Sequence, residues 1–180
     1  MRAAANWPWQ RELDMATERV TIAVIVRPAV AQDHEAIWRI RTRAIRSGCI
    51  SHYAPSDVER WVSASMPGDF ATVVETVPFH VAQHGDFLVG CGFLNVKQGE
   101  IGAMFTDPDA QRMGVATAIL AELENIALRE GVLTLRLDAT LNAVPFYSRA
   151  GYHVDKASTY RHPDGFELPC VTMIKMLGQP

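Results

Sequence analysis

The strongest constraint on the fold is a change of hydrophobic period along residues 79–139. Three strand-like runs come first, "FHVAQH", "DFLVGCGFLNV" and "GEIGAMFT", with a glycine-containing turn between each pair. Such short turns join antiparallel neighbours and therefore predict an antiparallel meander. Residues 115–129 then repeat apolar side chains at helical spacing, and "VLTLRLDA" returns to strand alternation. Strands interrupted by a helix predict a mixed α/β sheet.

The flanking segments complete the expected order of elements. "VTIAVIVRPA" (20–29) is β-branched and predicts a first strand, and Asp33 is placed to cap a helix after it. "PSDVERWVSAS" predicts a second helix, and Asn142 is placed to cap a short one, "AVPFYSRAG". "YHVDKAS" and "FELPCVTMIKML" predict two final strands. We therefore expect about seven strands and about four helices in a single domain over 20–177, after an N-terminal extension (1–19) that we expect to be mobile.

Composition excludes several classes of protein. The net charge of −3 leaves no electrostatic footprint for nucleic acid, and no apolar run reaches the length of about 20 residues that a membrane helix needs. Three scattered cysteines suit neither a disulfide framework nor a metal site. The N-terminus lacks the pattern of a secretory signal. We expect a cytoplasmic protein with reduced thiols, no bound metal and no membrane or nucleic-acid partner.

The stretch "FTDPDAQRMGVATAIL" has features of an anion-binding loop. The first turn of a helix leaves backbone N–H groups unpaired, and the helix dipole adds partial positive charge there. Gly114 and Ala116 keep side chains out of the way, and Thr117 adds a hydroxyl. The Walker and dinucleotide glycine patterns are both absent. The loop therefore predicts either a phosphate site of another type or a helix start that uses small residues for packing.

At this point the chain resembles the GCN5-related N-acetyltransferases. Their acyl-CoA signature is Q/R-x-x-G-x-G/A, and Gln111, Gly114 and Ala116 fit it in register. A second stretch, "LDATLNAVPFYSRAGYHV", is similar to the family's next strand and helix. The matching positions there are Asn142, Phe146, Tyr147, Gly151 and Tyr152. Together with the order of elements, the resemblance covers about residues 20–177 and implies the acyl-CoA N-acyltransferase fold.

The resemblance implies an activity and a cofactor site. Family members transfer an acetyl group from acetyl-CoA directly to an amine in a ternary complex, with no covalent enzyme intermediate. The pantetheine arm lies in a gap between the strands that correspond here to 99–106 and 132–139, and the pyrophosphate lies at the following helix. The implied cofactor-binding residues are Met104, Phe105, Thr106, Gln111, Arg112, Met113, Gly114, Val115, Ala116, Thr117 and Asn142.

Two proton transfers need residues as well. Tyr147 matches the family's acid for the departing thiolate, and a phenol is protonated at neutral pH. Its alternative role is a packing aromatic that only hydrogen-bonds the sulfur. Glu100 begins the strand where some relatives place a carboxylate that acts as the base through water, and its alternative role is that of a solvated turn residue. Weaker candidates for the base are His52, His80 and Glu59.

The acceptor is the least constrained part of the interpretation. "RSGCISHYAPSDVERW" resembles the acceptor region of a bacterial subgroup, so Tyr53 and Trp61 are candidate walls of the amine pocket, with core packing as the alternative for Trp61. We expect a small-molecule amine or a peptide or protein amine as acceptor. The resemblance also implies a homodimer paired through the last strand. Two other hypotheses are a non-catalytic acyl-CoA sensor on the same fold and an unrelated phosphate-binding α/β protein.

Overall fold

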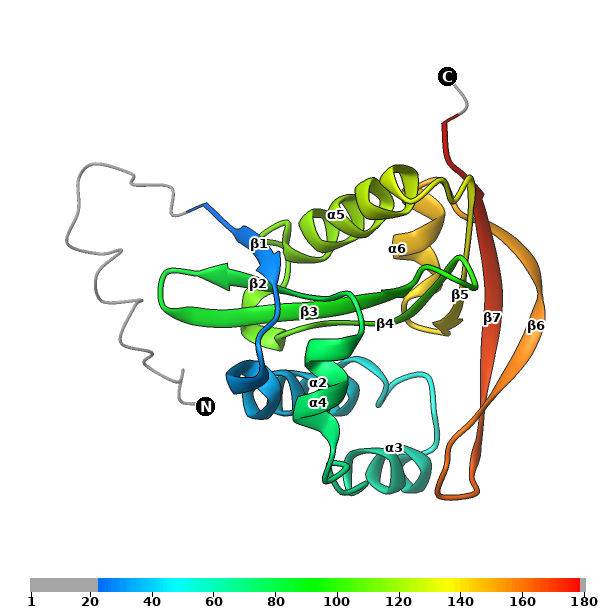
Figure 1. Cartoon of the computed structure of the whole chain (residues 1–180). Coiled ribbons are helices and arrows are strands. Elements are labelled where there is room, and N and C mark those ends of the chain that lie inside the picture. The colour runs from blue at the N-terminus through cyan, green and yellow to red at the C-terminus, as the bar shows by residue number, and fades with distance from the viewer. Residues whose placement is uncertain (1–22, 179–180) are drawn as a thin grey trace, which may run out of the picture.

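A computed structural model describes residues 23–178, which form one twisted seven-stranded sheet (Figure 1). Its strand order is β1-β2-β3-β4-β5-β7-β6, and every neighbouring pair is antiparallel except β4 and β5. The strands are β1 (Ile25–Pro28), β2 (Phe79–His84), β3 (Phe87–Asn95), β4 (Glu100–Thr106), β5 (Thr134–Thr140), β6 (His153–Arg161) and β7 (Glu167–Met176). The predicted meander is confirmed as β2–β3–β4. The proposed extension over 1–19 lies outside the described residues.

Helices cover both faces of this sheet. One face carries α5 (Val115–Arg129) and α6 (Val144–Arg149), and the other carries α2 (His34–Gly48), α3 (Pro55–Val62) and α4 (Phe70–Thr76) (Figure 1). The described residues thus form five α-helices, one more than expected. The additional helix is α4, whose sequence FATVVET is rich in β-branched residues with low helix propensity. No helix within residues 23–178 has the length and apolar content to cross a membrane.

The helix α4 is stabilised by tertiary contacts. Its Phe70 ring packs edge-on against Trp38 of α2, with ring centroids 5.3 Å apart, and against Phe79 of β2 at 6.2 Å. Val74 is buried in the same apolar cluster as Phe79. Burial of these side chains outweighs the weak local preference for a helix.

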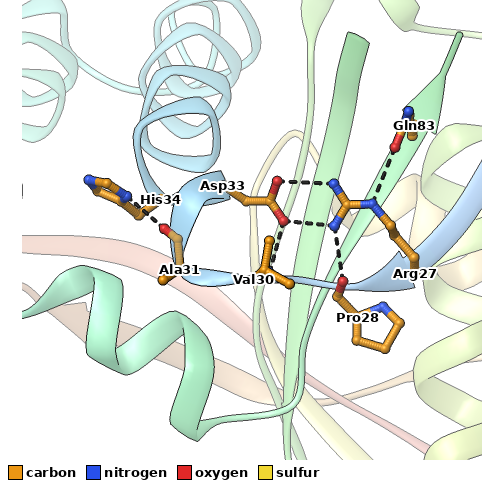
Figure 2. A network of polar contacts seen from close by, with 7 residues as sticks. All are labelled: Arg27, Pro28, Val30, Ala31, Asp33, His34 and Gln83. Carbon is orange, nitrogen blue, oxygen red and sulfur yellow. Dashed lines mark hydrogen bonds and ion pairs between the residues drawn. The ribbon is translucent and has the colours of Figure 1, made fainter. Parts of the chain in front are cut away.

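The entry into α2 is held by an ion pair. Asp33 occupies the N-cap position of α2 as expected, but without the expected side-chain bond. The carboxylate of Asp33 makes no capping bond to the first turn of α2. It pairs instead with the guanidinium of Arg27, with N–O distances of 2.8 and 3.0 Å, and accepts the Val30 N–H at 2.9 Å (Figure 2). Burial alone would raise the pKa of Asp33, but the hydrogen bonds from Arg27 and Val30 outweigh it and lower that pKa. Asp33 therefore ties β1 to the start of α2.

The apolar core is divided by the sheet. On the α5 side, Ile119 and Leu123 pack against the alternating Leu135 and Leu137 of β5. On the other side, α2 contributes to two clusters, one with α4 and β2 and one with α3 and the β6–β7 hairpin. Alternation along β5 turns Arg136 and Asp138 away from the α5 side, which matters for the site.

Candidate active site

The sheet splits between its two parallel strands. Only two residue pairs join β4 to β5, Glu100 with Arg136 and Ile101 with Leu137. The next residue of β4, Gly102, is the extra residue of a bulge, because Phe93 and Leu94 of β3 face Ala103 and Ile101. Bulges bend a strand and end its pairing. The strands therefore separate from Gly102 onward.

Gly102 is required by the ring that lies over it. A Cβ at this position would overlap the Phe93 ring, which itself packs at a tilt against the Phe79 ring, with centroids 4.9 Å apart. We expect Gly102→Ala to lower the free energy of unfolding by about 1–3 kcal/mol, as overpacking of a well-filled site does. Thermal unfolding measures this. The matched control is Gly68→Ala, where a Cβ would have open space, and an equal loss in both variants would refute the argument.

A cavity of about 850 Å³ follows the split. It is lined from the α5 side by residues such as Val115 and Tyr147, and from the other side by residues such as Ile45 and Trp61. Between them, β4 contributes residues 101–106 and β5 contributes 137–140. The cavity therefore connects the two faces of the sheet, so that one molecule can approach from each side.

The loop before α5 presents free backbone donors at one end of this cavity. Arg112 and Gly114 both have left-handed backbone, with φ of 65° and 79°, and no side chain caps the helix. Ala118 donates to the Gly114 carbonyl at 2.9 Å, while the earlier amides of the helix start have no helical acceptor. A Cβ at Gly114 would meet nothing within 4 Å. The space beside Gly114 and the first amides of α5 is therefore open, as a bound phosphate requires.

The same loop is fixed from behind by charged side chains. The Asp107 carboxylate accepts a hydrogen bond from the Asp109 N–H at 3.0 Å, which closes the turn before Gln111. Arg43 of α2 pairs with both carboxylates, at 3.1 Å to Asp107 and 2.6 Å to Asp109. These contacts hold the loop in one conformation without using the donors of the helix start.

Most of the predicted cofactor residues line this cavity. They are Met104, Phe105, Thr106, Gln111, Arg112, Gly114, Val115, Ala116, Thr117 and Asn142, and Met113 is not among the lining residues. The expected cap at Asn142 is wrong, because Ala143 holds the cap position of α6 and no side chain caps it. The Asn142 side chain instead accepts from the thiol of Cys49 at 3.5 Å, which draws it toward α2.

Tyr147 lies in the cavity wall on the α5 side and is almost fully buried. Its ring packs edge-on against Phe146 and Tyr152, with centroids 5.1 and 5.6 Å away. Burial raises the pKa of Tyr147 above its ordinary value, so its hydroxyl is protonated throughout the neutral range. It is a hydrogen-bond donor to whatever occupies the split.

The predicted base, Glu100, lies just outside the lining of this cavity, next to the lining residue Ile101. Glu100 is absent from the cavity lining and lies 3.8 Å from Arg136, its partner across the two-residue seam. The weaker candidates, His52, His80 and Glu59, do not line the cavity either. The sequence predicted correctly that Glu100 begins a strand, and the cavity lining along that strand starts at the next residue, Ile101.

Asp138 is the one residue with a carboxylate that lines the cavity within the described part of the chain. It follows Leu137, the last residue of β5 paired with β4, so it lies where the split opens. The hydroxyl of Thr172, on β7, donates to Asp138 Oδ1 at 2.6 Å and orients it. Sequence analysis missed Asp138, although strand alternation already put it on the face opposite Leu137.

The far end of the cavity, on the α2 side, is aromatic. Tyr53 and Trp61 both line it, as do Trp38 and Tyr160, which were not predicted. The Tyr53 hydroxyl already makes two hydrogen bonds, since it donates to the Pro169 carbonyl and accepts from the Leu141 N–H, both at 2.9 Å. Trp61 is also buried in the apolar cluster around α3, so the same side chain both packs in the core and lines the cavity.

An arginine, Arg41, also lines this end of the cavity. The sequence held a signal for it, because Arg41 interrupts the apolar stripe of α2 between Ile37 and Ile45. A charged residue on a stripe that faces the core is unusual unless it has a partner or a ligand.

Comparison with known proteins agrees with this geometry. The model of the acetyltransferase (GNAT) domain matches residues 49–175. The chain is 26% identical over 124 residues to an uncharacterized N-acetyltransferase, YafP, of Escherichia coli (strain K12), covering 69% of this chain and 77% of that protein.

Two solved structures give the same result for the fold. A GCN5-related N-acetyltransferase from Rhodopseudomonas palustris superposes with a TM-score of 0.81 at 26% identity, over 89% of this chain and 99% of that one. PaiA N-acetyltransferase from Thermoplasma acidophilum, solved with coenzyme A, gives a TM-score of 0.67 at 17% identity, over 86% and 99%. The chain belongs to the GNAT family and is an acetyl-CoA-dependent N-acetyltransferase.

Proposed function

We propose that this chain acetylates an amine of a small molecule or peptide, and that the reaction takes place in the split between β4 and β5. The observation that carries the proposal is the continuity of the cavity through the sheet, from the loop before α5 to the aromatic end beside α2. Two reactants that enter from opposite faces meet at the split, and direct transfer needs no covalent attachment to the protein. When bound, acetyl-CoA supplies the activated acetyl group.

The residues that would hold the cofactor fall into two sets. The amides at the start of α5 and the φ-positive residues Arg112 and Gly114 would hold the pyrophosphate. The edge of β4 beyond Gly102 lacks a strand partner on the β5 side, so its backbone groups are free for an extended arm. Met104, Phe105 and Thr106 are the residues of that edge.

Tyr147 acts at the leaving sulfur in this proposal. Its raised pKa keeps the hydroxyl protonated, and that value stands well above the ordinary pKa of a thiol, about 8.5. A phenol that holds its proton more tightly than the thiolate would acts by hydrogen bonding to the sulfur rather than by complete proton transfer. Tyr147 therefore stabilises the developing thiolate.

Asp138 acts at the amine. It enters the cavity from the face opposite Tyr147, because β5 alternates Leu137 and Ala139 toward α5 and Asp138 away from it. An amine that is protonated in water must lose a proton before it attacks, and a carboxylate at the opening of the split can accept that proton directly or through water. A sensor that only binds acyl-CoA has no need of such a group.

The test is acetyl-CoA-dependent turnover. We expect acetyl-CoA at a concentration 100-fold above its Kd to stabilise the protein by about 2.7 kcal/mol, seen as a rise in melting temperature. We also expect thiol release from acetyl-CoA that depends on an added amine, measured across an amine panel. An unchanged melting temperature in millimolar acetyl-CoA would contradict the cofactor site, and tight binding without turnover of any amine would favour the sensor.

A further inference from the structure

Arg41 is a buried cation that lacks an ionic partner. Only 9% of the surface of Arg41 is exposed to solvent, and no carboxylate of residues 23–178 forms an ion pair with it. Nη2 donates to the Trp61 carbonyl at 3.2 Å, while Nη1 is buried without any hydrogen-bond partner. The guanidinium lies over the ring of Trp38, with 4.4 Å between Cζ and the ring centroid.

Such an arrangement is costly without a ligand. A guanidinium cannot lose its charge near neutral pH, and a buried charge without a counter-ion destabilises the folded protein. Burial lowers the pKa of Arg41, and Tyr160 and Asp164 act in the opposite sense through space. No hydrogen bond or ion pair joins Asp164 to the guanidinium, so it acts on Arg41 only through space. The protein thus leaves one positive charge and one free donor in the wall of its cavity.

The surroundings narrow the chemistry of the missing partner. Arg41 lines the cavity beside the aromatic rings of Trp38, Trp61 and Tyr160, on the side of the sheet opposite α5. This is the acceptor end under the proposed function, on which this inference rests. One unpaired charge and one free nitrogen match a monoanionic carboxylate, whereas a phosphate dianion calls for more than one cation. We propose that the acceptor is an amine that also carries a carboxylate and an aromatic or apolar side chain, and that Arg41 binds the carboxylate.

The test uses acceptor pairs that differ only in the carboxylate. Phenylalanine is compared with phenethylamine, and tryptophan with tryptamine, in turnover with acetyl-CoA and in calorimetric binding to the CoA-saturated protein. We expect the amino acids to be preferred about 10- to 100-fold in kcat/KM, the range of a charge-assisted hydrogen bond. In Arg41→Met the ratio of kcat/KM for the amino acid to that for the matching amine should fall to about one. Arg41→Lys should give an intermediate ratio, because lysine keeps the charge but lacks the planar pair of guanidinium donors.

A second arginine of the same helix is the matched control. Arg46 is exposed and lies 3.8 Å from Glu59, so Arg46→Met should leave the preference ratio unchanged. Melting temperatures separate binding from a structural role. Arg41→Met should melt at or above the temperature of the wild type, because it removes an uncompensated charge. A lower melting temperature with an unchanged ratio would make Arg41 a structural residue and overturn the inference.

Other outcomes are equally decisive. Equal use or equal binding of both members of each pair by the wild type overturns the inference, as does binding of neither member at millimolar concentration. A larger preference for O-phosphoethanolamine over ethanolamine would identify a phosphate and overturn the carboxylate. If no acceptor is turned over while binding still depends on the carboxylate and on Arg41, the inference stands as an anion site and the proposed function fails.

Discussion

Tyr147→Phe should lower kcat by about 10²-fold while the KM for acetyl-CoA changes by less than about threefold. The substitution removes only the hydroxyl, so the leaving thiolate loses its donor and the ring keeps its contacts with Phe146 and Tyr152. Steady-state kinetics with a thiol-release assay measure both constants. A melting temperature close to that of the wild type shows that the packing has survived.

The pH profile adds an independent check on Tyr147. Because burial raises the pKa of this phenol, its protonated form persists above the ordinary value of 10.0. The wild-type kcat should therefore show no decline from ionisation of Tyr147 between neutral pH and about pH 10. A Phe variant with full activity would reduce Tyr147 to a packing residue.

Asp138→Asn is expected to lower kcat/KM for the acceptor by about 10²-fold at neutral pH. The amide is nearly the same size as the carboxylate but cannot accept the proton of the ammonium group. The deficit should shrink as the pH approaches the pKa of the acceptor amine, because the free amine then needs no base. A pH series of kcat/KM for wild type and variant measures the convergence.

Glu100→Gln is the matched control for the variant of Asp138. It removes the same charge from the neighbouring strand, at a residue that lies against Arg136 and outside the cavity lining. We expect its kcat/KM to stay within about twofold of the wild type, as for a surface change away from the reacting atoms. A greater loss in Glu100→Gln than in Asp138→Asn would return the role of base to Glu100.

Local patterns predicted the parts of the site that depend on backbone conformation. The helix start after Gln111 could be predicted from local spacing, and α5 does begin at Val115, whereas the choice of a phosphate site over packing came from the family resemblance and stays a prediction. The meander could be placed because short glycine turns allow little besides antiparallel neighbours. Both features depend on residues close together in the sequence.

Features that depend on distant partners could not be read in this way. Asp33 and Asn142 were expected to cap helices, but Arg27 and Cys49 offer them other contacts. The helix α4 forms against Trp38 and Phe79 despite its β-branched sequence. In each case the tertiary surroundings override a local preference.

The two proposed functional residues beyond the family motifs needed the three-dimensional arrangement for the same reason. Asp138 becomes a candidate only because the β4–β5 pairing stops one residue before it. Arg41 becomes one only because no carboxylate of the described chain pairs with it. Strand alternation and the stripe of α2 mark the two positions but say nothing of what lies opposite them.

The narrow seam between β4 and β5 also determines how the sheet is built from the chain. The strands β1 to β4 come from residues 25–106 and β5 to β7 from residues 134–176, so each half of the sheet is an uninterrupted stretch of polypeptide. Two residue pairs are the only strand-to-strand connection between these halves in the described sheet. A cofactor bound in the split beyond these two pairs therefore adds contacts between the halves that main-chain pairing supplies elsewhere in the sheet. We expect the two halves to be held together most firmly when the cofactor is bound.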